Sequence, residues 1–65
     1  MKYRVYYNSK SAQLVADIIK SEDLSVTQRV FVDALGDTLI KVSGSNEEVG
    51  IFREIYELAG GDLDG

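Results

Sequence analysis

The absence of cysteine constrains this chain more than any other feature of its sequence, because the chain has only 65 residues. A domain of about this size buries only about 60% of the surface that its unfolded chain exposes, so its margin of stability is small. Without cysteine, no disulfide and no thiolate metal site can add to that margin. We therefore predict one domain over residues 1–65, held by a single hydrophobic core, with residues 60–65 as a mobile tail.

The composition is that of a folded protein, with 45% hydrophobic and 28% charged residues. No stretch approaches the roughly 18 consecutive apolar residues that a membrane span needs, so we expect no contact with a membrane. Residues 1–4 begin a strand-like pattern and not the apolar run of a signal peptide. Together with the lack of cysteine, these features favour the cytoplasm, which would be the host cytoplasm if a phage encodes the chain.

Three segments favour β-strands. Residues 2–7 alternate in polarity and are rich in tyrosine and valine, which is typical of a half-buried strand. Residues 25–34 form a valine-rich run, and residues 38–43 form another apolar run. Between these two runs, residues 35–37 supply a Leu-Gly-Asp turn. The pattern predicts a single strand followed later by a hairpin.

Two segments favour α-helices. Residues 8–11 offer several N-cap side chains, and the apolar positions that follow fall on one stripe of a helix that ends near residues 20–23. That stripe consists of Ala12, Leu14, Val15, Ile18 and Ile19. Ser45 and Glu48 have the spacing of a capping box, in which Glu48 reaches back to the backbone of Ser45. A second helix should therefore start there and stop at the glycines 60–61.

The element order predicts an α+β fold of βαββα type. A right-handed crossover after the first strand places the third strand between the other two, which gives a three-stranded mixed sheet of order 1-3-2. Both helices should cover one face of this sheet. The other face would then be bare.

No set of residues in the sequence is typical of an enzyme. The chain has no histidine, and its Ser, Asp, Glu and Lys residues do not match a catalytic triad, a metal-ligand spacing or a nucleophile elbow. Residues 8–11 could hold a phosphate at a helix start, with Lys10 as the cation, but the glycines of a P-loop are missing. Helix capping is the favoured interpretation, and we expect neither catalysis, a cofactor nor a metal.

The charge of the chain is unevenly distributed. Residues 1–20 hold four basic residues and one acidic residue, whereas residues 46–65 hold one basic and six acidic residues, and the net charge is −4. In the second helix the apolar residues should occupy one side, namely Val49, Ile51, Phe52, Ile55, Tyr56, Leu58 and Ala59. The carboxylates should line the other side and continue into the tail, as Glu47, Glu54, Glu57, Asp62 and Asp64.

This carboxylate row supports two interpretations. Glu54 and Glu57 lie about 4.5 Å apart along a helix axis, which is of the order of the 3.4 Å phosphate rise of one DNA strand. Such a row can imitate DNA toward a basic protein and steer its association. Alternatively, it is a solvated helix face that only keeps an acidic protein soluble. Gly50 would leave a flat spot among the exposed residues, at a cost of about 1 kcal/mol relative to Ala.

The bare sheet face is the second candidate surface. If Tyr3, Val5 and Ile40 point toward the helices, the alternate residues point away, and Val30, Val32 and Val42 join the first set. The outward set consists of Arg4, Tyr6, Arg29, Phe31, Leu39 and Lys41. Its apolar members favour burial in a homodimer. Its aromatic and basic members are also suited to single-stranded nucleic acid, although the net charge opposes this use.

The second half of the chain resembles the DinI-like family of small acidic βαββα proteins. The resemblance covers residues 25–65: a strand ending in Val-Ser-Gly at 42–44, an acidic helix start at 47–48, the sequence Glu-Ile at 54–55, and an acidic tail. In that family the acidic C-terminal helix binds the recombinase RecA where DNA would otherwise lie. By this resemblance Glu54, Glu57, Asp62 and Asp64 would contact the partner.

Small acidic phage proteins that disable host DNA-binding proteins are similar in size and charge. The sequence therefore favours a non-enzymatic modulator, encoded by a phage or by its host. It would bind a basic DNA-binding protein, such as a recombinase or a nucleoid protein, and block the DNA site of that protein. A direct nucleic-acid binder and a structural dimerisation module are the alternatives.

Overall fold

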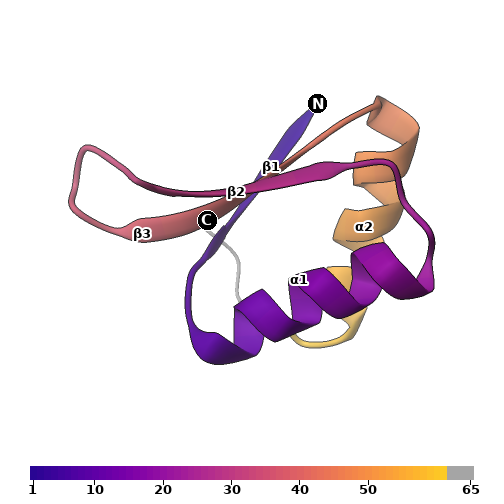
Figure 1. The fold of residues 1–65 in the computed structure, drawn as a ribbon, viewed down its shortest axis with the longest axis horizontal. Coiled ribbons are helices and arrows are strands. Elements are labelled where there is room, and N and C mark those ends of the chain that lie inside the picture. The colour runs from indigo at the N-terminus through magenta and orange to yellow at the C-terminus, as the bar shows by residue number, and fades with distance from the viewer. Residues whose placement is uncertain (62–65) are drawn as a thin grey trace.

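The computed structural model describes residues 1–61, which fold in the predicted βαββα order (Figure 1). The elements are β1 (Lys2–Tyr6), α1 (Ser9–Ser21), β2 (Thr27–Val32), β3 (Thr38–Ser43) and α2 (Asn46–Leu58). β2 is shorter than the predicted segment 25–34, because Asp33 already belongs to the hairpin turn. No helix among these residues has the length and apolar character to cross a membrane.

The sheet has the predicted order, with β3 between β1 and β2. The prediction of a mixed sheet is wrong, because both hydrogen-bonded pairs are antiparallel. β1 and β2 do run in the same direction, but β3 separates them, so no parallel pair forms. The register aligns Ile40 with Val5 on one side and with Val30 on the other.

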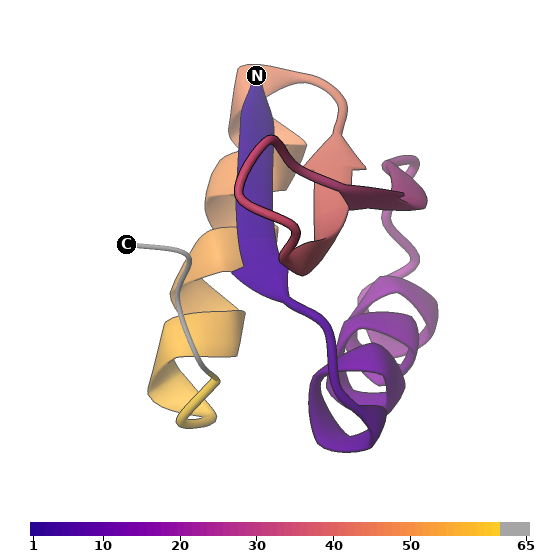
Figure 2. The ribbon, with the colours of Figure 1, turned by 90° about the vertical axis from the view of Figure 1, so that its left-hand side faces the viewer.

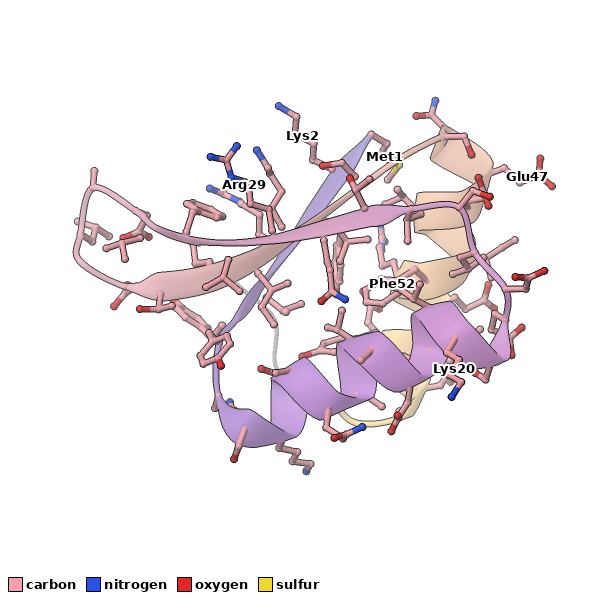
Figure 3. All side chains as sticks on the ribbon, viewed as in Figure 1. Met1, Lys2, Lys20, Arg29, Glu47 and Phe52 are labelled. Carbon is pink, nitrogen blue, oxygen red and sulfur yellow. The ribbon has the colours of Figure 1, made fainter. Side chains whose placement is uncertain are left out.

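The core lies between the sheet and the two helices. Phe52 of α2 projects into this space (Figure 3), and its ring stacks on that of Tyr56 with centroids 5.7 Å apart. The ring of Tyr3 from β1 meets both rings edge-on at 6.2 Å. The buried core consists of Val5, Val15, Ile18, Ile40, Val42, Phe52 and Tyr56. α2 runs alongside β1 (Figure 2), so this half of the sheet is well covered.

Specific caps fix where the helices end. Asn8 caps α1 by accepting the Ser11 N–H at 2.8 Å, and the Ser11 hydroxyl accepts the Asn8 N–H at 2.9 Å. α2 ends at Leu58 with Ala59 as its C-cap, and the next residue, Gly60, has a φ of +79° that suits a residue without a side chain. The Gly60 N–H bonds to the carbonyl of Glu57 and the Gly61 N–H to that of Tyr56, which is a Schellman motif. A Cβ at Gly61 would overlap the Tyr56 ring.

Neither helix covers the half of β2 next to the hairpin turn, although both helices were expected to cover this face of the sheet. Val30 and Val32 lie on the side of the sheet that faces the helices, but their side chains are 53% and 64% exposed. The β2–β3 hairpin projects past both helices (Figure 1), because each helix has only 13 residues and the core they share is centred on β1 and β3. The alternation of side chains along a strand correctly predicts which side of the sheet each residue faces. It does not predict whether a helix lies over that residue.

Candidate functional site

The solvent side of α2 carries exposed acidic residues with apolar residues between them. Glu47 and Glu54 are exposed, and Glu47 points away from the molecule at the start of the helix (Figure 3). Ile51 and Leu58 were predicted on the apolar side, but they are 38% and 82% exposed. At 100° per residue both side chains lie within about 40° of Glu47 around the helix axis. The buried side of α2 is therefore narrower than predicted. We name Glu47, Ile51, Glu54 and Leu58 the α2 outer stripe.

Glu57 lies at the border of this surface and is held by two neighbours. Its Oε2 accepts hydrogen bonds from the Tyr3 hydroxyl at 3.3 Å and from the Arg53 Nε at 3.2 Å. Burial, followed by the charge and the hydrogen bond of Glu57, raises the pKa of Tyr3 to about 12. Glu57 therefore ties α2 to β1, and it is less free than Glu47 or Glu54 to meet a partner.

The sequence pattern did not predict the contacts of Tyr3, which lies 54 residues from Glu57. The Arg53–Glu57 pair has the i, i+4 spacing of a helical ion pair, so this contact could have been found from the sequence. Both side chains are largely exposed, and such pairs contribute little to stability. The predicted contact residues Asp62 and Asp64 lie outside the described residues.

Glu48 acts as a structural residue at the start of α2. Its backbone N–H bonds to the Ser45 hydroxyl at 3.2 Å, as the capping prediction requires. Its carboxylate differs from the prediction, because it accepts the Ser25 N–H at 2.7 Å and the Ser45 hydroxyl at 3.3 Å and not the Ser45 backbone. The carboxylate thus joins α2 to the segment before β2, which explains why Glu48 does not take part in the outer stripe.

Gly50 leaves an open spot beside the stripe. An added Cβ at this position would have no heavy atom within 4 Å apart from its chain neighbours and the backbone of its own helix. A shallow depression there is lined by Gly50, Arg53, Glu54 and Glu57. A partner can therefore approach the helix backbone closely at this point.

The opposite surface of the sheet is basic. The register places Arg4, Lys41 and Arg29 directly beside one another across the three strands. Lys2 lies on the same face, and both Lys2 and Arg29 point away from the helices (Figure 3). We name Lys2, Arg4, Arg29 and Lys41 the basic face. Like charges directly opposite one another on neighbouring strands repel, so this row concentrates positive charge on one face of the sheet.

The neighbouring row on the basic side is apolar. Tyr6, Leu39 and Phe31 are cross-strand partners there, so all six residues that were predicted to point outward share one face. Leu39 is fully buried within the single chain, and Lys41 lies with its Nζ 5.8 Å from the centre of the Phe31 ring. The apolar area left for another molecule is therefore mainly that of Tyr6 and the partly buried Phe31.

The start of α1 serves as a capped helix end. Asn8 occupies the N-cap, and the Ser11 hydroxyl donates to the Tyr6 carbonyl at 2.7 Å. These bonds confirm that Asn8 and Ser11 cap the helix, as the sequence predicted. Within residues 1–61, no three His, Cys, Asp or Glu side chains gather as a metal site.

Comparison with known proteins adds no relative to this description. The chain matches no protein-family model, and no curated protein or solved structure matches it either.

Proposed function

We propose that this protein is a non-enzymatic cytoplasmic modulator. It binds a basic DNA-binding protein through the outer side of α2 and blocks the DNA site of that protein. One observation carries the proposal: Glu47 and Glu54 are exposed on one helix face together with the apolar residues Ile51 and Leu58. The carboxylates would attract and orient a basic surface, and the apolar side chains would be buried in the contact. The predicted Asp62 and Asp64 would extend this contact.

The resemblance to the DinI-like family makes a RecA-type recombinase the first partner to test. The immobilised protein is incubated with purified recombinase and, separately, with a bacterial lysate at low salt. We expect a DNA-binding protein to be retained and to be released as the salt concentration rises, because exposed charges are screened. Added in excess, the free protein should also displace labelled DNA from the retained partner.

Charge reversal at two exposed positions tests the surface itself. Glu47→Lys with Glu54→Lys should abolish retention and displacement. The matched control, Asp17→Lys in α1 with Glu22→Lys at its C-cap, makes the same change in net charge on exposed residues and should retain binding. Equal binding by both double variants, or no retained DNA-binding protein, would contradict the proposal.

A second candidate function rests on the basic face. We propose as the alternative that a single nucleic-acid strand lies against this face, with phosphates at the row Arg4–Lys41–Arg29 and bases stacking on Tyr6 or Phe31. Fluorescence titration of labelled single strands should show binding that weakens with salt. Arg29→Gln with Lys41→Gln should remove it, whereas Lys10→Gln with Lys20→Gln on α1 should not. Absence of binding at low salt would contradict this alternative.

A further inference from the structure

The outer edge of β2 is exposed both along its backbone and at its side chains. β2 lies at the border of the sheet, and the side chains of Val30 and Val32 are more than half exposed. Leu35 in the adjoining turn is 87% exposed. Large apolar side chains beside an open sheet edge are the usual features of a site where another strand adds.

The hairpin fixes which backbone groups face this edge. The Asp33 N–H donates to the Asp37 carbonyl at 2.9 Å, so Asp33 bonds toward β3. Because bonding alternates along an antiparallel pair, Phe31 and Arg29 also bond to β3, whereas Val30 and Val32 direct their N–H and C=O groups outward. No hydrogen bond from within residues 1–61 reaches these outward groups. The edge therefore offers two donors and two acceptors in a row.

β2 also lacks the features that usually prevent an edge strand from pairing with a strand of another chain. The chain has no proline, and Arg29 is the one charged residue of β2. The ladder with β3 is continuous from Thr27 to Val32, without a bulge. Nothing in this stretch prevents a second strand from pairing along it.

The sequence of the strand is complementary to itself. In an antiparallel pairing centred on Phe31, Val30 lies opposite Val32 of the partner subunit, and Arg29 lies opposite Asp33 of the partner subunit, the residue that follows β2. The Asp33 Oδ1 accepts two N–H groups of its own turn, so Arg29 would pair with a carboxylate that is already held in place. The two phenylalanine rings face each other at the centre, and aromatic and opposite-charge cross-strand pairs both stabilise a sheet. A register centred on Val30 would place Arg29 opposite Phe31 of the partner subunit and would lose both ion pairs.

We propose that this protein forms a two-fold dimer in which β2 pairs antiparallel with β2 of a second copy. The two three-stranded sheets then become one continuous sheet. The two-fold axis runs perpendicular to the sheet, so the exposed valines of both copies meet on the helix side. The α2 outer stripes of both copies face the same side, which makes the dimer bivalent toward any partner of that surface.

Sedimentation equilibrium over a concentration series tests the dimer. The mass should rise from 7.2 kDa toward twice that value as concentration increases. Val30→Lys with Val32→Lys places like charges opposite one another and should raise the dimer dissociation constant by at least about tenfold. Both positions are exposed, so circular dichroism should show an unchanged fold. The control Leu58→Lys on α2 should dimerise like the wild type.

A protein that stays monomeric at all concentrations would overturn the proposal. Dimerisation of the lysine double variant with wild-type affinity would overturn it as well.

Single cysteines test the register, because the chain has none of its own. The Cα atoms of a directly opposed, non-hydrogen-bonded pair lie about 4.5 Å apart, which is within the range of a disulfide. Phe31→Cys should therefore cross-link under mild oxidation faster than Val30→Cys or Leu58→Cys. Faster cross-linking at either of the other two positions would exclude the pairing centred on Phe31.

Discussion

Val5 and Val30 lie opposite the same residue, Ile40, and on the same side of the sheet, yet only one of them is buried. Val5 of β1 is 0% exposed and Val30 of β2 is 53% exposed. The rings of α2 close over β1, whereas the outer half of β2 extends beyond both helices (Figure 1). The β1 side of the sheet is thus stabilised by burial, and the β2 side depends on hydrogen bonds to β3 and on its turn.

The largest expected effect comes from truncating each valine in turn. Val5→Ala should lower the free energy of unfolding by about 2 kcal/mol, because it removes buried methyl groups and leaves a cavity. Val30→Ala should lower it by only about 0.5 kcal/mol. Urea unfolding at a concentration that keeps the protein monomeric measures both. Equal losses would show that the two sides of the sheet are packed alike.

A second test removes the polar support of the β2 side. Asp33 Oδ1 accepts the N–H groups of Leu35 and Asp37, each at 2.9 Å, and so holds the turn. Asp33→Ala should lower the free energy of unfolding by about 1 kcal/mol, since two bonds to a charged acceptor are lost at a partly buried site. Asp37→Ala removes the same charge but no bond to the turn. It is therefore the control and should cost less in the same urea titration.

The sequence predicted the elements well where local chemistry sets their limits. β3 has the predicted bounds, because turn residues precede it and a helix cap follows it. The uncovered valines could not be predicted, because alternation does not tell how far a helix reaches. Ile51 and Leu58 were wrongly predicted on the buried side of α2, because they are apolar although their helical angle places them with Glu47.

For the candidate surfaces too, local patterns could be predicted from the sequence, whereas tertiary contacts could not. The register confirms which side of the sheet each strand residue faces, since a period of two leaves no other choice. The engagement of Glu57 by Tyr3 depends on how α2 lies against β1, which is a tertiary contact that no local pattern reports. The use of either surface in binding remains a prediction.

On the β1 side, Tyr3 provides a test that depends on pH. Its pKa is raised to about 12, first by burial and then by Glu57. A raised pKa means that the neutral phenol stabilises the fold fully below the unfolded pKa of about 10, and that this contribution is lost as pH rises through 12. The free energy of unfolding of the wild type should therefore fall between these two pH values.

Tyr3→Phe removes this titration. The variant should lose about 0.5–1 kcal/mol at neutral pH, where the bond to Glu57 is missing. Its loss of stability between pH 10 and 12 should then be smaller than that of the wild type. Parallel alkaline unfolding curves for the two proteins would contradict the assignment of the shift to Tyr3.

The smallest expected effect lies where α1 leads into β2, the less covered strand. Asp23 has a φ of +51°, and the Leu24 N–H bonds to the Ile19 carbonyl at 3.0 Å, so α1 also ends in a Schellman motif. Glycine adopts this conformation without a side-chain clash, so Asp23→Gly should raise the free energy of unfolding by about 0.5 kcal/mol. Asp23→Ala removes the same charge but keeps a Cβ, and should lower it. In thermal unfolding, the melting temperature should be highest for Asp23→Gly, intermediate for the wild type and lowest for Asp23→Ala. If the two variants have equal melting temperatures, the change of charge and not the backbone conformation sets the effect.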